Sequence, residues 1–168
     1  MKLLRMLSSL ERWDGHRDVH RKNPTICGDA IADLRTSNNC LSTWCSNDEN
    51  EKDIAIVALA LGSDKAEKLC FVLLDENELH NIEIEISDKC KGRAGGLNEE
   101  LLNNHRDLIE LDYNHIGKLA NYISPMVREG HFEVVTKLQI KELLTSFKER
   151  NLIDVTKVND NLKHDLSW

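Results

Sequence analysis

The sequence predicts an α+β fold: a small mixed sheet with helices packed on it, and amphipathic helices at the N-terminus and near the C-terminus. Residues 69–74 form a dense apolar run of strand length, and residues 82–86 alternate strictly between isoleucine and glutamate. Helical spacing of apolar residues, by contrast, is clearest at Ile140, Leu143, Leu144 and Phe147. Strand and helix patterns in one short chain are typical of this fold class.

Length and composition indicate about one domain. The chain has 168 residues, enough for one sizeable core. Hydrophobic residues make up 40% and charged residues 30%, which is the balance of a folded rather than a disordered chain. We expect an N-terminal helical or docking segment at residues 1–22, an α/β core domain at 23–150 and a C-terminal tail at 151–168.

The N-terminal segment carries an apolar stripe with spacings of three and four. Its members are Leu3, Met6, Leu7, Leu10 and Trp13. The stripe predicts a helix over residues 2–13 that packs on the core or docks in the groove of a partner. The only dense basic patch follows at residues 12–22. Such a run is typical of a solvated face, and a local contact with nucleic acid is the alternative.

Short elements are expected next. Residues 29–36 predict a short helix or turn, and residues 37–39 predict a tight turn because asparagine tolerates left-handed backbone. Residues 41–46 predict a strand, and residues 47–52 a polar loop. The apolar, alanine-rich residues 53–61 favour a nearly fully buried helix, with a buried strand as the alternative.

The middle of the chain predicts strands and then helices. Residues 69–74 should form a buried strand. Residues 82–86 should form a strand with one solvent-exposed face, and the two strands are expected to share a sheet. Residues 89–96 predict a loop that three glycines make mobile. Residues 97–111 have helical character.

The last third is predicted to be mostly helical. Asp112 should cap a helix that ends near Ser124, because a proline disfavours helix in the residue before it. Residues 132–136 suit either a strand or the entry to the amphipathic helix at 140–147. The polar tail carries scattered apolar residues, including Leu166 and Trp168, and should dock on the body or on a partner.

No group of polar residues has the spacing of a catalytic or metal centre. Cys40 with Cys45, and His16 with His20, lack the matching second pair that a structural zinc site requires. The glycine cluster at 92–96 lacks the signature of a phosphate-binding loop. We therefore expect no catalytic residues, no metal and no cofactor.

Glu83 and Glu85 are the exception that we keep as an enzymatic hypothesis. On a strand, residues two apart point to the same face, and paired carboxylates can act in glycosyl or ADP-ribosyl transfer. The simpler interpretation is a half-exposed strand, because alternation of isoleucine and glutamate is what such a strand looks like.

Charge and cysteine content indicate which partners and which cellular compartment to expect. The chain carries 22 Lys and Arg against 29 Asp and Glu, a net charge of −7, which argues against a broad nucleic-acid-binding face. Five cysteines without a secretory leader are typical of a cytoplasmic protein with reduced thiols. No apolar run approaches the length that spans a bilayer, so we expect no membrane association.

Two stretches of the chain carry a family resemblance. The first is DAIADLRTSNNCLSTW at residues 29–44, followed by DIAIVALA at residues 53–60. The second runs from Leu97 to Leu111 and contains HRDLIEL. Together they resemble the small middle component of prokaryotic ABC-three-component defence systems, including the Lamassu type, over roughly residues 29–125.

The resemblance implies a non-enzymatic adaptor subunit. Its partners would be an ATPase similar to structural-maintenance-of-chromosomes (SMC) proteins and an effector, often a nuclease, in defence against phage or plasmids. An acidic surface could dock on a basic partner. The interaction residues that we predict come from four segments: Leu3, Leu7, Leu10 and Trp13; Arg35, Asn39 and Trp44; His105, Arg106 and Asp107; and Leu166 and Trp168.

Two other functions stay open at this point. One is a free-standing acidic immunity or antitoxin protein that blocks a single toxin. The other is the small enzyme that would use Glu83 and Glu85.

Overall fold

The computed structural model describes residues 1–13, 28–90 and 92–168, and these residues form a six-stranded sheet with the order β4-β5-β2-β1-β3-β6. All of its pairings are antiparallel, so the α+β class is confirmed while the expected mixed sheet is an antiparallel one. The strands are β1 (Lys2–Leu7), β2 (Leu41–Cys45), β3 (Leu69–Asp75), β4 (Glu85–Ser87), β5 (His105–Ile109) and β6 (Glu133–Val135).

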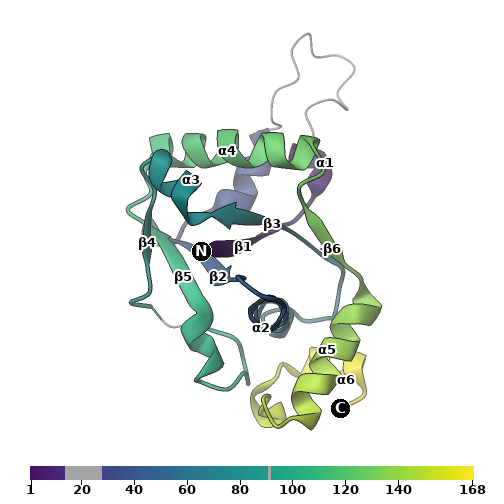
Figure 1. Cartoon of the computed structure of the whole chain (residues 1–168). Coiled ribbons are helices and arrows are strands. Elements are labelled where there is room, and N and C mark those ends of the chain that lie inside the picture. The colour runs from purple at the N-terminus through teal and green to yellow at the C-terminus, as the bar shows by residue number, and fades with distance from the viewer. Residues whose placement is uncertain (14–27, 91) are drawn as a thin grey trace.

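Helices cover both faces of this sheet. Figure 1 shows α3 and α4 on one side and α2 on the other, with α5 and α6 beyond α2. The α-helices are α1 (Leu10–Trp13), α2 (Glu49–Leu61), α3 (Glu76–Asn81), α4 (Tyr113–Arg128), α5 (Lys137–Glu149) and α6 (Asp160–Leu166). Three short 3₁₀ segments complete the described chain: η2 (Gly28–Leu34), η3 (Leu101–Asn104) and η4 (Val155–Lys157).

Alternation along the strands builds two apolar cores. Leu4 and Phe71 point to the face that α2, α5 and the C-terminal segment cover. Leu3 and Val72 point to the face that α1, η2 and α4 cover. Because both faces are buried, β1 and β3 carry apolar residues on both faces, which hides the two-residue period that normally marks a half-exposed strand.

That masking explains why the N-terminal helix prediction is wrong. Residues 2–7 form β1, which pairs with β2 on one side and β3 on the other. An apolar run that is buried on both faces also matches a helical stripe. Residues 1–13 are therefore not a separate docking unit, since β1 is central to the sheet. Residues 14–27 lie outside the described residues, and most of the predicted basic patch lies there.

The helix expected at residues 97–111 is also corrected. Only Leu101–Asn104 is helical, as η3, and His105–Ile109 is strand β5 between β2 and β4. Isolated propensity favoured a helix here, but the pairing of β5 with two strands decides the conformation. Glu110, with φ of 55°, then ends the strand.

Several other boundaries differ by a few residues. The segment predicted as a loop at 47–52 contains the start of α2, because the Asp48 carboxylate accepts the Glu51 N–H and caps the helix at Glu49. The helix predicted at 53–61 is confirmed, and it is mostly buried. The strand predicted at 82–86 covers only Glu85–Ser87, because Glu83 adopts φ of 63°.

The last third follows the prediction except at Pro125. Asp112 caps α4 as expected, but the helix passes through Pro125 and ends at Arg128. Ile123 and Val127 are buried on either side of the proline, and this packing favours continuation of the helix. The tail docks on the body of the protein, where Leu162 is fully buried.

Among the helices of the described residues, none combines the length and the apolar character needed to cross a bilayer.

Candidate functional site

The predicted interaction residues at the N-terminus lie inside the protein. Leu3, Leu7 and Trp13 are at most 2% exposed, and Leu10 packs half-buried against the same core. Internal packing therefore accounts for the apolar stripe. A side chain with no exposed area cannot contact a partner while the fold is intact, so we correct the docking interpretation for these three residues.

The predicted C-terminal residues are held against α5. Leu166 and Trp168 are partly buried against the core on the α2 side of the sheet. The Lys148 ammonium lies 4.9 Å from the centre of the Trp168 ring. Asp165 accepts hydrogen bonds from Lys137 at 3.0 Å and from the Ala66 N–H at 3.2 Å. These contacts fix the end of the chain on the body.

The three interaction residues predicted in the first resembling stretch do not lie together in the structure. Arg35 and Asn39 are exposed, whereas Trp44 is 5% exposed and belongs to the core. Asn39 has φ of 59° and its carbonyl accepts the Leu111 N–H, which gives it a structural role in the turn. The three side chains therefore do not form one patch.

The two resembling stretches nevertheless meet, because β2 and β5 are neighbours. Ser42 lies opposite Asp107, and Trp44 lies opposite His105. Residues two apart share a face, so all four side chains point to the α2 side of the sheet. The Trp44 and His105 rings meet edge to face with 5.2 Å between their centroids. Arg106 points to the other face.

Hydrogen bonds centre on Asp107. Its Oδ1 accepts from the Ser42 hydroxyl at 3.3 Å and lies 3.6 Å from Nε2 of His105. Nδ1 of the same imidazole lies 3.0 Å from the Cys90 carbonyl oxygen. A carbonyl can only accept, so the Nδ1 atom carries a proton. His105 and Asp107 are each 6% exposed, while Ser42 is exposed.

This order of groups does not suit nucleophilic catalysis by serine. A catalytic serine gives its proton to a histidine, which a carboxylate then orients from its far side. Here the carboxylate lies between Ser42 and His105, and the far nitrogen of the imidazole is bound to a main-chain carbonyl. The arrangement can bind a polar group, but it cannot relay the serine proton to the imidazole.

The cluster opens into a concavity of about 460 Å³, which we call the hollow. Its walls come from β1, β2, β5, the C-terminal end of α2 and the loop after β4. Gly92 of that loop is required, since a Cβ there would lie 2.4 Å from Cη2 of Trp44. The lining residues are Met6, Ser42, Trp44, Ala58, Leu59, Gly62, Ser63, Cys90, Arg93, His105 and Asp107.

A second concavity, of about 480 Å³, lies at the other end of α2, and we call it the acidic groove. It runs between α2, α5 and the edge strand β6. No local sequence pattern indicated this groove, because its residues come from three distant segments. The lining residues are Glu49, Lys52, Asp53, Ile56, Glu133, Val134, Val135, Gln139, Glu142, Leu143 and Ser146.

Four carboxylates and one ammonium set the charge of the acidic groove. Lys52 bridges Glu49 at 2.8 Å and Glu133 at 3.3 Å, and the hydrogen bond that its ammonium donates to Glu49 is the main reason that the pKa of Lys52 is raised. Partial burial raises the pKa of Asp53, and the charge of Glu49 adds to this. Ile56, Val135 and Leu143 supply apolar surface between the charges.

The predicted pairing of Glu83 with Glu85 is wrong. Glu83 precedes β4 and forms an ion pair with Lys118, whose hydrogen bond lowers the pKa of the carboxyl group. Glu85 is exposed on β4. The left-handed conformation of Glu83 breaks the alternation that would have aligned the two side chains.

Metal-ligating residues do not gather in the part of the chain that the structure describes. No three His, Cys, Asp or Glu side chains of these residues could hold one ion. Cys40 is half-buried and Cys45 buried, and both are free thiols, while His16 and His20 lie outside the described residues.

Comparison with protein-family models, with curated proteins and with solved structures gives no match for this chain. The function is therefore inferred from its residues and their geometry.

Proposed function

We propose that this protein is a non-enzymatic adaptor that binds other proteins through the acidic groove. Its expected partners are an SMC-like ATPase and an effector nuclease of a bacterial defence system against phage or plasmids. The family resemblance of residues 29–60 and 97–111 supports the choice of partners. The groove is the observation that supports binding.

The acidic groove combines charged and apolar surface, as a protein-binding surface requires. Four carboxylates surround an apolar floor, and Lys52 neutralises only part of their charge. Val134 and Leu138, at 42% and 66% exposure, extend apolar surface beside it. Among the described residues, no strand pairs with the outer edge of β6, so a basic, partly apolar segment could pair with it.

Acidic residues around such a groove favour a basic partner. Complementary charge raises the association rate and suppresses wrong partners more than it raises affinity. An adaptor needs this kind of specificity, because it must bring two chosen proteins together. We therefore expect a Lys- or Arg-rich surface on the ATPase or the nuclease.

Co-expression with the products of neighbouring reading frames tests this proposal. We expect a large ATPase to co-purify with this chain at a fixed stoichiometry, as measured by native mass spectrometry. The double variant Glu49→Lys, Glu142→Lys should weaken that complex by about tenfold or more in affinity.

The matched control is Glu99→Lys, Glu100→Lys, which makes the same change in net charge outside the groove. It should leave affinity within about twofold, because exposed charges far from an interface contribute little. Equal weakening by both doubles would show a net-charge effect and contradict the groove. A chain that purifies alone beside its co-expressed neighbours would contradict the adaptor function.

A free-standing immunity protein is the second candidate, since an acidic groove also suits a basic toxin. Co-purification of a single toxin, with no ATPase, would favour it. An enzyme that uses Glu83 and Glu85 is the weakest candidate, because Glu83 lies outside strand β4 and is paired with Lys118.

A further inference from the structure

Asp107 is a buried carboxylate without a strongly basic partner. Its residue is 6% exposed, and no Lys or Arg of the described chain lies within ion-pair distance of it. Its contacts are the Ser42 hydroxyl and, at 3.6 Å, the His105 imidazole. A buried charge is costly unless a counter-charge or several hydrogen bonds compensate for it.

The histidine compensates for this charge only when it carries two protons. Its Nδ1 proton is directed at the Cys90 carbonyl, so a neutral imidazole presents a lone pair from Nε2 to the Asp107 oxygen. Two acceptors then face each other across 3.6 Å. A cationic donor that enters the hollow would bond to the carboxylate and remove this conflict.

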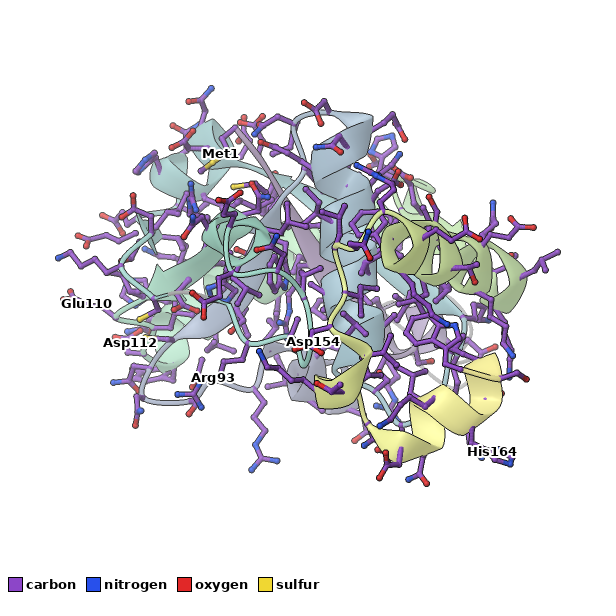
Figure 2. The ribbon with its side chains drawn as sticks, turned by 90° about the horizontal axis from the view of Figure 1, so that it is seen from below. Met1, Arg93, Glu110, Asp112, Asp154 and His164 are labelled. Carbon is purple, nitrogen blue, oxygen red and sulfur yellow. The ribbon has the colours of Figure 1, made fainter. Side chains whose placement is uncertain are left out.

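The rest of the hollow also favours a cation. Leu59, Gly62 and Ser63 bring the C-terminal end of α2 to its wall, and the carbonyl groups there carry partial negative charge. Met6, Ala58 and Leu59 give an apolar wall on which the methylene stem of a long side chain can pack. Among the described lining residues, Arg93 carries a positive charge that would repel a cation. Its side chain is exposed, so water and salt screen this repulsion. Figure 2 views this side of the molecule and labels Arg93.

A second buried carboxylate, that of Asp33 on the opposite face of the sheet, provides a comparison. Asp33 is 7% exposed, accepts hydrogen bonds from Trp13 and the Ser8 N–H, and acts electrostatically on Arg5 of β1. The fold itself supplies a guanidinium there. At Asp107 the fold supplies an open hollow instead.

We propose that the hollow receives a Lys or Arg side chain of a partner protein, whose cationic head bonds to Asp107. The choice of a protein as the source rests on the proposed adaptor function. The site itself does not, because the chemistry of the hollow belongs to the isolated chain. The cation would bond to Asp107 and Ser42, and its stem would lie along Met6 and Leu59.

The test is a titration of the isolated, ¹⁵N-labelled chain with three probes followed by NMR. The probes are Nα-acetyl-arginine methylamide, Nα-acetyl-lysine methylamide and the uncharged Nα-acetyl-citrulline methylamide. We expect saturable shifts at Ser42, Asp107 and the Trp44 indole N–H, with a dissociation constant for at least one cationic probe about tenfold below that for citrulline. Comparing the arginine and lysine arms identifies the preferred head group.

Two variants complete the test. Asp107→Asn should abolish the preference for the cationic probes, while its spectrum shows that the fold is kept. Arg93→Ala should bind the cationic probes at least as tightly as the native chain. Equal binding of charged and uncharged probes, or a preference that survives Asp107→Asn, would overturn the inference. Because the titration uses the chain alone, its failure leaves the adaptor proposal standing, and failure of the co-purification leaves the titration standing.

Discussion

Two buried aspartates on opposite faces of the sheet have opposite surroundings. Asp33 accepts hydrogen bonds from the Trp13 indole at 2.8 Å and the Ser8 N–H at 3.1 Å, beside Arg5. Burial lowers the pKa of Arg5 to about 10, and the Asp33 carboxylate acts against that shift. Asp107 accepts one hydroxyl hydrogen bond and lies at the wall of a hollow.

The difference separates a structural carboxylate from one that can bind. The Asp33 carboxylate accepts hydrogen bonds from Trp13 of α1 and from the Ser8 N–H after β1, and the main-chain carbonyl of Asp33 accepts one from Arg5 of β1, so this residue holds η2, α1 and β1 together. At Asp107 compensation is incomplete and space is left open. Sites that are not optimal for stability are where function is expected. The contrast predicts that the same substitution will have different consequences at the two positions.

The largest expected effect is at Asp33. Asp33→Asn removes a charge that acts electrostatically on the half-buried Arg5, and it weakens the hydrogen bonds that the carboxylate accepts from Trp13 and the Ser8 N–H. Weakening hydrogen bonds to a buried charged acceptor is expected to lower the free energy of unfolding by about 3 kcal/mol. Urea titration followed by circular dichroism measures this change.

Asp107→Asn is the matched comparison. It removes an incompletely compensated charge and weakens one hydrogen bond, and these effects oppose each other, so we expect a change within about 1 kcal/mol. If Asp107→Asn lowers the free energy of unfolding as much as Asp33→Asn does, both aspartates are structural and the difference drawn between them is wrong.

The next effect concerns the loop that covers the hollow. Gly92→Ala places a Cβ against the Trp44 ring, and overpacking of this kind should cost about 2 kcal/mol. Gly117→Ala in α4 meets no atom within 4 Å and should instead stabilise the protein by about 0.7 kcal/mol, since alanine favours a helix. Thermal melts of both variants check the opposite signs. Equal effects would mean that the loop does not rest on Trp44.

The smallest effect concerns a half-buried carboxylate, that of Asp165, as a third case beside the two buried ones. The hydrogen bond from Lys137 lowers the pKa of Asp165 below its ordinary value. A carboxyl group whose pKa is lower in the folded state stabilises the fold above its unfolded pKa of about 4, and this contribution is lost as the pH falls through the folded pKa. The native chain should therefore have a higher urea midpoint than Asp165→Asn at pH 6, and the two should converge by about pH 2. A difference that stays constant with pH would exclude a titrating ion pair.

The sequence predicted the elements whose signals are local. Asp112 and the apolar face that follows it indicated α4, and the alanine-rich run after Asp53 indicated α2. Asn38 and Asn39 occupy the predicted tight turn with positive φ. Capping, propensity and backbone tolerance act within a few residues, so they can be recognised without knowing the fold.

The candidate sites were predicted only in part. Trp44, His105 and Asp107 were named, but as parts of separate stretches, because strand β5 looked helical. Ser42 and Gly92 were not named as site residues, and the acidic groove was not found. Each depends on which strands are neighbours or on how α2 and α5 pack, and no short-range pattern carries that information.

By itself, the sequence determined the α+β class, the capped helices, the turn before β2 and an acidic surface charge. The tertiary structure alone decided that the N-terminal stripe is a central strand and that Asp33 meets Arg5 while Asp107 faces a hollow. The physical reason is that helix caps and turns are stabilised by neighbours in sequence, whereas strand pairing and the compensation of a buried charge depend on groups that only folding brings together.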